Sequence, residues 1–415
     1  MSCPECNQEY THYGTWCKPC YSKHFKDNFD KWTSGNETID KIIQNAQLNA
    51  NGYWGRRIHL AEWFDGYIRV WNVENQQWKR YGQQKVALKK FGDFANLDEE
   101  FLNEMIIHLK TKNNGSIQFY GITQDPESHK YTMVLNYAEG GNFRDYLKNN
   151  FNDINWKNKL DYLYNLVEKF LRIHKLDIIR QDFHPGNILS FDFKNSLLNI
   201  YISDFGLSKI VGQNPNNPEK KIFGVLPYIA PEVLGGEEYT KAADVYSFGI
   251  IAYEIVTGLP PYYNIPHNKD LAMKICNGLR PKIPFHNPNL ITRMIMRCWD
   301  ARITYRPTFK ELENELFKYC VDYNETYYKN NKITIQIKKA EEFSTSTNAA
   351  STDTTITTPL NYQTHPQAIY TSRLLNFSSL PKPKNEENFE KELEELTESV
   401  DDLSTSDSGM MDLNV

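Results

Sequence analysis

The sequence lacks three features that would narrow its function at once. No apolar run in its 415 residues approaches the roughly 20 residues that a membrane-spanning helix needs. The N-terminus has no signal-peptide core, and 47 basic and 52 acidic side chains nearly cancel to a formal net charge of −5. We therefore expect a cytoplasmic protein, with a nuclear location as the alternative, that has no membrane partner and no general attraction to nucleic acid.

Cysteine is scarce, with seven residues, and in a reducing compartment these are expected to be thiols or metal ligands. Four of them form two Cys-x-x-Cys pairs near the N-terminus, Cys3, Cys6, Cys17 and Cys20. Two such pairs can close a tetrahedral four-sulfur site, so we predict a structural Zn²⁺-binding element over residues 1–30. The alternative is four unliganded thiols, because the gap between the pairs is shorter than the usual ribbon spacing.

Changes in composition divide the rest of the chain into three parts. Apolar residues at helical spacing predict a short helix within a linker over residues 31–57. A globular body spans residues 58–323. Residues 344–358 are almost wholly Ser, Thr, Asn, Asp and Ala, a composition that buries too little apolar surface to fold. We therefore expect the tail, residues 324–415, to be mostly disordered.

One stretch of this tail has helical periodicity. Near residues 386–403, apolar side chains recur among glutamates at alternating four- and three-residue steps, at Phe389, Leu393, Leu396, Val400 and Leu403. This spacing predicts a short acidic helix with an apolar seam, which suits a docking partner or a short coiled coil. A transient helix without a partner is the alternative.

The most informative stretch runs from Arg180 to Leu189 and is followed by Asp204-Phe205-Gly206. It places the carboxylate of Asp182, the carboxamide of Asn187 and the carboxylate of Asp204 at a particular spacing. That spacing is typical of a phosphoryl-transfer site that orients a hydroxyl group and holds Mg²⁺. The motif therefore predicts a protein kinase.

A basic and an acidic residue upstream complete this pattern. Residues 84–91 are predicted to form a strand that carries Lys89 between apolar neighbours. The periodic stretch 99–107 is predicted to form a helix on which Glu104 can reach Lys89. Alone, two such residues are more often surface charges, but their order relative to the acidic motifs downstream favours an ion pair.

With these motifs in place, residues 84–323 resemble the eukaryotic protein kinase domain, closest to its tyrosine-kinase-like group. Further motifs in register are Ala230-Pro231-Glu232, Asp244-Val245-Tyr246-Ser247-Phe248-Gly249, Cys298-Trp299-Asp300 and Arg306-Pro307. The resemblance implies an α+β, bilobal protein kinase fold, preceded by the zinc knuckle and followed by the disordered tail. Residues 58–138 would form a small β-rich lobe with one helix, and residues 139–323 a large, mainly helical lobe.

The resemblance also implies ATP and Mg²⁺ as cofactors and proteins as substrates. Asp182 would accept the proton of the substrate hydroxyl, and Lys89 with Glu104 would position the nucleotide. Asn187 and Asp204 would hold Mg²⁺. The adenine ring would be contacted by Ala87 and Leu189 and by the backbone of the hinge, at Asn136 and Ala138.

The resemblance also implies two contacts with a structural role. Glu232 would pair with Arg306, and Asp244 would hold the catalytic loop through backbone amides.

The phosphate-covering loop departs from the kinase pattern. Its glycine-rich motif is reduced to residues 51–60, where only Gly52 and Gly55 remain and bulky side chains occupy positions that need close backbone approach to phosphate. The first strand before it is also missing. We expect weak nucleotide binding from this loop.

The catalytic loop around Asp182 and the activation segment, residues 207–229, depart from the kinase pattern as well. Arg180-Gln181 replaces the usual His-Arg, which predicts no activation by phosphorylation of the activation segment and a looser alignment beside Phe205. His184 stands where a lysine would steady the γ-phosphate, so slow turnover is expected. Gly224-Val225 replaces Gly-Thr and leaves the choice between Ser/Thr and Tyr substrates poorly specified.

The sequence therefore predicts an ATP-dependent protein kinase that acts on Ser/Thr, with Tyr left open, in intracellular signalling. The alternative is a pseudokinase scaffold that acts through protein–protein interaction, because its glycine-rich loop is degenerate. A third hypothesis, a zinc-dependent nucleic-acid binder, is disfavoured because the chain has no basic stripe.

The zinc prediction is tested by metal analysis of the purified full-length chain. We expect one Zn²⁺ per chain, because two thiolate pairs complete one tetrahedron. Replacing Cys6 and Cys17 by Ser removes one ligand from each pair and should release the metal. Zinc-free wild-type protein, or retention of zinc by the double variant, would contradict the four-cysteine site.

Overall fold

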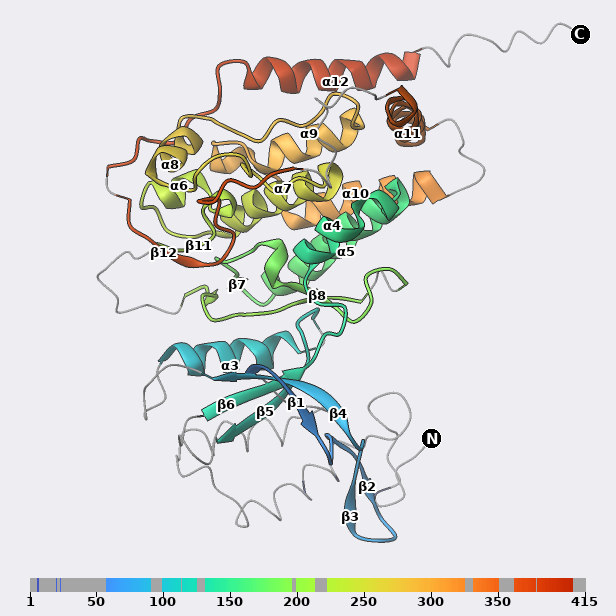
Figure 1. The fold of residues 1–415 in the computed structure, drawn as a ribbon, viewed down its shortest axis with the longest axis vertical. Coiled ribbons are helices and arrows are strands. Elements are labelled where there is room, and N and C mark those ends of the chain that lie inside the picture. Colours follow the sequence, from blue (N-terminus) through green and yellow to red (C-terminus); the bar gives the residue numbers. More distant parts are fainter. Residues whose placement is uncertain are drawn as a thin grey trace, which may run out of the picture. The chain divides into compact units, whose positions relative to one another are not determined.

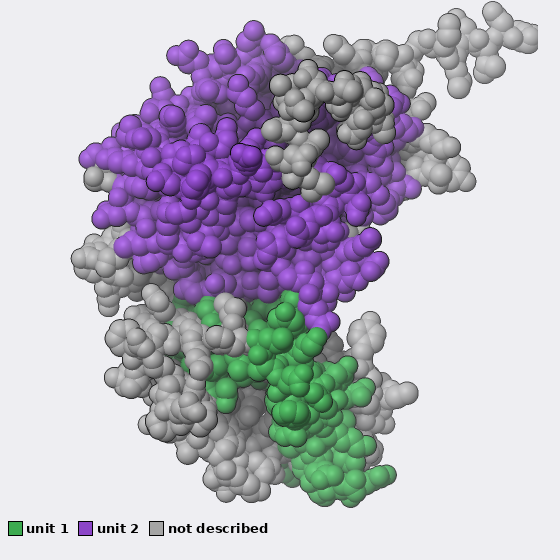
Figure 2. Space-filling view, viewed as in Figure 1, with its two compact units in different colours: residues 1–138 green, residues 139–415 purple. Residues whose placement is uncertain are grey.

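The chain forms two compact units, residues 1–138 and residues 139–415 (Figure 2). The computed structural model describes residues 57–90, 99–112, 114–124, 131–195, 199–212, 222–324, 331–350, 362–377 and 379–405, together with Cys6, Cys20 and Lys23. The boundary between the units follows Ala138, where the sequence placed the hinge. Within these residues, no helix is both long enough and apolar enough to cross a bilayer.

Some predictions fall on other parts of the chain. Cys3 and Cys17, the linker up to residue 56 and residues 51–56 of the predicted glycine-poor loop lie outside the described residues. Residues 57–60 of that loop prediction belong to a strand instead. The described part of the chain holds no cluster of three or more His, Cys, Asp or Glu side chains arranged to bind a metal. The zinc element therefore stays a prediction.

The first unit is built on a four-stranded antiparallel sheet with strand order β1-β4-β6-β5 (Figure 1). Its strands are β1 (Arg57–Trp63), β4 (Gln84–Lys90), β5 (Phe119–Gln124) and β6 (Tyr131–Asn136), and helix α3 (Glu99–Thr111) belongs to the same unit. Apolar side chains of both elements are buried, among them Val86 and Met133 from the sheet and Phe101 and Met105 from α3. The sheet and α3 therefore share one core.

A hairpin interrupts the connection between β1 and β4. Strands β2 (Ile68–Asn72) and β3 (Gln77–Arg80) pair with each other in a separate two-stranded sheet. The indole rings of Trp71 and Trp78 meet edge to face across the strand pair, with 4.9 Å between the ring centroids. Tyr67 stacks on Tyr81 with 4.8 Å between the ring centroids. The aromatic residues of this segment thus stabilise the hairpin by contacts with one another.

The second unit is mainly helical. Its helices before the tail are α4 (Phe143–Asn150), α5 (Trp156–His174), α6 (Pro231–Leu234), α7 (Lys241–Thr257), α8 (Lys269–Cys276), α9 (Asn289–Cys298) and α10 (Phe309–Asn324). Helix α5 begins at a capping box between Asn155 and Asn158. Helix α7 begins after Thr240, whose side chain caps it, and ends at Gly258 with φ 71°. Nearly every residue of α7 is buried, so this helix is the centre of the unit.

Short strands carry the loops between these helices. They are β7 (Ile178–Ile179), β8 (Ile188–Ser190), β9 (Ile200–Ile202), β10 (Lys209–Ile210) and β11 (Ile222–Gly224). Strand β8 pairs with β9, and β7 pairs with β10. The architecture of the described residues is the expected α+β arrangement of a β-sheet unit followed by a helical unit.

The tail corrects the expectation of disorder. It contains α11 (Lys332–Ala350), β12 (Arg373–Leu375) and α12 (Phe389–Thr405). The stretch predicted to be disordered begins inside α11, and its remainder, from residue 351, lies outside the described residues. Helix α11 is anchored by Ile333, Ile337 and Ala340, which recur at helical spacing and are buried.

The acidic helix α12 also packs against the chain itself. It lies along α9 (Figure 1), with Phe389 buried and Leu393 and Leu396 half-buried. The guanidinium group of Arg302 contacts Glu390 at 3.1 Å. The first half of the predicted apolar seam therefore has a partner within the second unit. The side chains of Val400 and Leu403 lie outside the described residues.

The predicted pair between Glu232 and Arg306 is confirmed. Two hydrogen bonds of 2.7 Å join the carboxylate to the guanidinium group, and both side chains are almost fully buried. The remaining donors of Arg306 reach the carbonyl oxygens of Asp300 and Ala242 at 2.7 and 3.0 Å. A buried charge pair, in which Arg306 makes four hydrogen bonds, ties α6 to the segment before α10.

Breaking this pair should destabilise the second unit strongly. Arg306→Ala leaves the Glu232 carboxylate buried without its counter-ion, so the free energy of unfolding should fall by about 3–5 kcal/mol. Urea unfolding followed by tryptophan fluorescence measures the change. As a control, Lys391→Ala removes one partner of an exposed pair with Glu395 and should change stability by less than about 0.5 kcal/mol. Equal effects of the two substitutions would contradict the assigned role.

Candidate active site

The first unit contributes the predicted lysine–glutamate pair. Lys89 on β4 donates to both carboxylate oxygens of Glu104 on α3, at 2.8 and 2.7 Å. Glu104 is fully buried, and its Oε1 also lies 3.5 Å from Nε2 of His108. A buried carboxylate fixes the lysine ammonium group in one place at the sheet, as expected for a cation that positions phosphate.

The residues predicted to contact adenine in this unit lie close together. Ala87 on β4 is directly opposite Leu135 on β6 in the antiparallel register. Asn136 is the last residue of β6, and its backbone amide donates to the carbonyl oxygen of Gln118 at 2.8 Å. Ala138 is buried two residues further on. Ala87 on β4 therefore lies next to the end of β6, where the predicted hinge residues Asn136 and Ala138 follow.

In the second unit, one buried carboxylate fixes the catalytic loop. Asp244 on α7 accepts hydrogen bonds from the backbone amides of Arg180 and Gln181 at 2.9 and 3.2 Å, which confirms its predicted role. Nε2 of His174 lies 2.9 Å from the same carboxylate. Gln181 has φ 64°, a left-handed conformation that a non-glycine residue adopts only when its surroundings hold it there.

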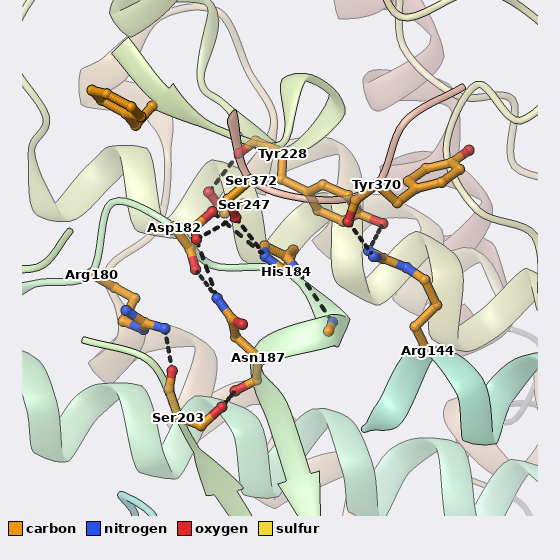
Figure 3. A network of polar contacts seen from close by, with 12 residues as sticks. Arg144, Arg180, Asp182, His184, Asn187, Ser203, Tyr228, Ser247, Tyr370 and Ser372 are labelled. Carbon is orange, nitrogen blue, oxygen red and sulfur yellow. Dashed lines mark hydrogen bonds and ion pairs between the residues drawn. The ribbon is translucent and has the colours of Figure 1, made fainter. Parts of the chain in front are cut away.

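The same loop brings Asp182 and Asn187 together (Figure 3). The side-chain nitrogen Nδ2 of Asn187 donates to the backbone carbonyl oxygen and to Oδ2 of Asp182, at 3.1 and 3.3 Å. Since the nitrogen is used in this way, the amide oxygen of Asn187 is directed to other partners. Asp182 is itself buried, with 6% of its surface exposed.

Asp204 is placed beside Asn187 by strand pairing. Strands β8 and β9 pair antiparallel, and Ser203 donates to the carbonyl oxygen of Asn187 through its amide at 2.9 Å and its hydroxyl at 3.1 Å. Asp204 follows with φ 57°, another left-handed residue. A carboxylate and an amide oxygen at one end of a strand pair are ligands that Mg²⁺ prefers, so these residues fit the metal that the sequence implies. Leu189, the predicted adenine contact of this unit, lies on β8.

Arg180 corrects the expectation that it would loosen this region. It is completely buried, donates to the carbonyl oxygen of Ser203 and to the hydroxyl of Ser208, and lies over the ring of Phe205 at 4.8 Å. The hydroxyl of Ser208 donates back to the carbonyl oxygen of Arg180 at 3.1 Å. The arginine therefore clamps the segment around Asp204 to the catalytic loop.

The carboxyl of Asp182 is strongly acidic. Burial alone would raise its pKa, but the hydrogen bond and charge of His184, the hydrogen bond from Ser372 and the charge of Arg180 outweigh burial and lower the pKa to about 2. The carboxylate is thus ionised at neutral pH. Burial lowers the pKa of His184 below its usual value, although the neighbouring Asp182 opposes this shift.

A neutral His184 has a defined tautomer. Its Nδ1 accepts a hydrogen bond from the amide of Gly186 at 3.1 Å, so the ring proton is on Nε2. Nε2 lies 3.3 Å from Oγ of Ser372 and 3.6 Å from Oδ1 of Asp182. Motif reasoning missed Ser372, because it lies in the tail and its own neighbours carry no signature.

The described hydroxyl groups of the activation segment are used internally. Ser208 is buried against Arg180, and Tyr228 is buried with its hydroxyl donating to Glu254. Neither is presented for modification, in keeping with the expectation that phosphorylation of this segment does not activate the chain.

Comparison with known proteins agrees with this geometry. The family model described as protein tyrosine and serine/threonine kinase matches residues 66–316, more than half of the chain. A putative serine/threonine-protein kinase/receptor of Acanthamoeba polyphaga mimivirus is 33% identical over 315 residues, 71% of this chain and 18% of that protein. The probable serine/threonine-protein kinase roco5 of Dictyostelium discoideum is 30% identical over 246 residues, 57% of this chain and 8% of that protein. A serine/threonine-protein kinase of Arabidopsis thaliana is 25% identical over 287 residues, 64% of this chain and 48% of that protein. The chain thus spans less than half the length of each of these relatives.

The low pKa of Asp182 makes stability depend on pH. With a folded pKa of about 2 against the usual 3.8, this carboxyl contributes stability that is present above the usual value and lost as the pH falls through 2. From about pH 5 to about pH 3, the wild type should lose about 1 kcal/mol more unfolding free energy than Asp182→Asn. Urea unfolding at the two pH values measures this, with exposed Asp153→Asn expected to follow the wild type. Equal losses in wild type and Asp182→Asn would contradict the depressed pKa.

Proposed function

Because the chain belongs to the protein tyrosine and serine/threonine kinase family, we propose that it transfers the γ-phosphate of Mg-ATP to hydroxyl groups of protein Ser or Thr side chains in intracellular signalling. The observation that carries this proposal is the buried, ionised Asp182 with a serine hydroxyl on its carboxylate and Asn187 beside it. The relatives are named as serine/threonine-protein kinases, which supports Ser/Thr over Tyr as the substrate class.

Asp182 orients the attacking hydroxyl in this reaction. Its carboxylate accepts a hydrogen bond from the substrate hydroxyl, and this bond aims the hydroxyl oxygen at the γ-phosphorus. With a pKa of about 2, Asp182 is a weak base, so we infer that positioning matters more than early proton removal. A loose transition state fits this, since the acceptor loses its proton only as the new bond to phosphorus nears completion.

The other residues hold the nucleotide in the proposed reaction. Lys89, fixed by Glu104, would bind the α and β phosphates. Ala87 and Leu189 would each contact the adenine ring, and the hinge backbone at Asn136 and Ala138 would hydrogen-bond to it. Mg²⁺ held by Asn187 and Asp204 would supply positive charge against the phosphates.

His184 tunes the rate of this reaction. A neutral imidazole beside the acceptor supplies one hydrogen-bond donor where a lysine would supply a full positive charge. We therefore propose a slow enzyme. The second candidate function is a pseudokinase scaffold, which is favoured by the glycine-poor residues 51–60.

Transfer and nucleotide binding can be tested separately on the full-length chain. Labelled γ-phosphate transfer to an added protein acceptor reports the reaction, and thermal stabilisation by Mg-ATP reports binding. Asp182→Asn should lower transfer about 10²–10⁴-fold, because it removes the carboxylate that orients the acceptor, and should keep the Mg-ATP stabilisation. Asp204→Ala should lose transfer and Mg²⁺-dependent stabilisation together, whereas exposed Asp153→Asn should change neither.

Two outcomes would overturn the proposed enzyme. Stabilisation by Mg-ATP without transfer to any acceptor would leave the scaffold. No metal-dependent binding of ATP even at millimolar concentration would remove the nucleotide from the function altogether.

A further inference from the structure

Residues 362–377 of the tail are held against the second unit by regular backbone contacts. The amide of His365 donates to the carbonyl oxygen of Tyr263 at 2.7 Å, and the amide of His267 donates to that of Gln367 at 2.9 Å. Further along, the hydroxyl of Tyr370 donates to the carbonyl oxygen of Pro261 at 2.9 Å. These contacts are spread along the segment, and two of the three involve its backbone. They therefore fix how the segment runs over the rest of the unit.

A half-buried cation anchors the segment just before Ser372. Arg144 on α4 donates to the carbonyl oxygen of Tyr370 at 2.9 Å, and its guanidinium group lies 4.9 Å from the centre of the Tyr370 ring. The same group bonds to the hydroxyl of Tyr228 and lies 3.6 Å from Glu254. The tail thereby completes a charge network that joins it to the activation segment and α7.

Strand pairing sets the register of the segment at the catalytic loop. β12 pairs antiparallel with β11, with Arg373 opposite Gly224 and Leu375 opposite Ile222. Leu375 is buried. Gly224 is close to the catalytic carboxylate, since a Cβ atom added to it would lie 3.4 Å from Oδ1 of Asp182. The tail thus adds a strand to the activation segment, as extended peptides do when they bind a sheet edge.

This register brings Ser372 to Asp182 (Figure 3). Its hydroxyl donates to Oδ2 of Asp182 at 2.6 Å, and Nε2 of His184 lies 3.3 Å from the same oxygen of Ser372. Ser372 nevertheless remains exposed. A hydroxyl that donates to this carboxylate and is still accessible from outside meets the geometric requirements of a phosphoryl acceptor.

We propose that residues 362–377 bind as an internal substrate and that Ser372 is the acceptor of an intramolecular phosphoryl transfer from ATP. The proposal rests on the kinase activity proposed above. Oγ of Ser372 forms a bond to the γ-phosphorus of ATP, and the bond from this phosphorus to the β–γ bridging oxygen breaks. ADP leaves with that electron pair, and the hydroxyl proton passes to Asp182 and then to solvent.

The product of this step is repelled from the site. Phosphoserine carries close to two negative charges at neutral pH and would lie beside the ionised Asp182. Its segment therefore leaves, and the surface along β11 becomes available to other proteins. Before the transfer the tail blocks this surface, and after it the block is removed.

The test uses full-length chain with Mg-ATP, phosphosite mapping by mass spectrometry and an added casein acceptor. Ser372 should be labelled at a rate that does not depend on protein concentration, because acceptor and catalytic loop belong to one chain. Ser372→Ala should remove this label, whereas Thr371→Ala, which removes the adjacent exposed hydroxyl, should leave it within about twofold.

A mixture of two variants separates intramolecular from intermolecular transfer. Ser372→Ala keeps the proposed catalytic residues, and Asp182→Asn keeps the acceptor. In a mixture of these two chains, Ser372 of the Asp182→Asn chain should stay unlabelled. Hydrogen exchange of the amides of residues 222–224 and 373–375 should become faster in wild-type chain after labelling, because the strand pair opens.

The outcomes distinguish the two proposals. Labelled casein with unlabelled Ser372, or labelling of Ser372 in the variant mixture, overturns the internal substrate and leaves the kinase activity standing. No label on casein or on any site of the chain, despite ATP binding, overturns the kinase activity and the acceptor role of Ser372 with it.

Discussion

The geometry of the catalytic loop depends on the buried carboxylate of Asp244. It holds two consecutive backbone amides, those of Arg180 and Gln181, and is itself fixed by His174 from α5. Hydrogen bonds from amides to a buried carboxylate are strong, and they set the backbone from which Asp182 projects. Because Asp244 belongs to α7, a helix of the second unit that is almost entirely buried, the position of Asp182 is tied to the core of that unit.

Arg180 illustrates how a change of residue can be compensated within this frame. Its guanidinium group donates hydrogen bonds to the carbonyl oxygen of Ser203 and the hydroxyl of Ser208 and lies over the ring of Phe205. The segment around Asp204 is therefore held by a cation already present in the fold. This contact agrees with the prediction that no phosphate on the activation segment is needed to order it. We therefore expect regulation of such a site where the substrate hydroxyl would bind, and the tail occupies that position through Ser372.

The sequence predicted those features whose chemistry is contained in short motifs. Lys89 with Glu104, Glu232 with Arg306 and the bracing by Asp244 follow from residue types at fixed spacing, and the structure has these contacts. The packed tail was not predictable in this way. The helical spacing of Ile333, Ile337 and Ala340 competes with a strand-like alternation of Ile333, Ile335 and Ile337, and a strand of three residues has no periodicity to detect. The contact of Ser372 with Asp182 spans 190 residues and depends on the pairing of β12 with β11.

If the chain acts as the proposed kinase, tethering determines what a protein substrate must overcome. The tail is held on both sides of Ser372, by the ring contact of Tyr362 with Tyr263 and by the hydrogen bonds of Asn385 with Asp300 and Ala301. A segment tied at both ends meets its site at a high effective concentration, so a free peptide with the same contacts binds far less. A competing substrate must replace the backbone pairing with β11 and supply a hydroxyl donor to Oδ2 of Asp182. In the proposed reaction, the unmodified tail therefore selects against protein substrates that lack either of these two features.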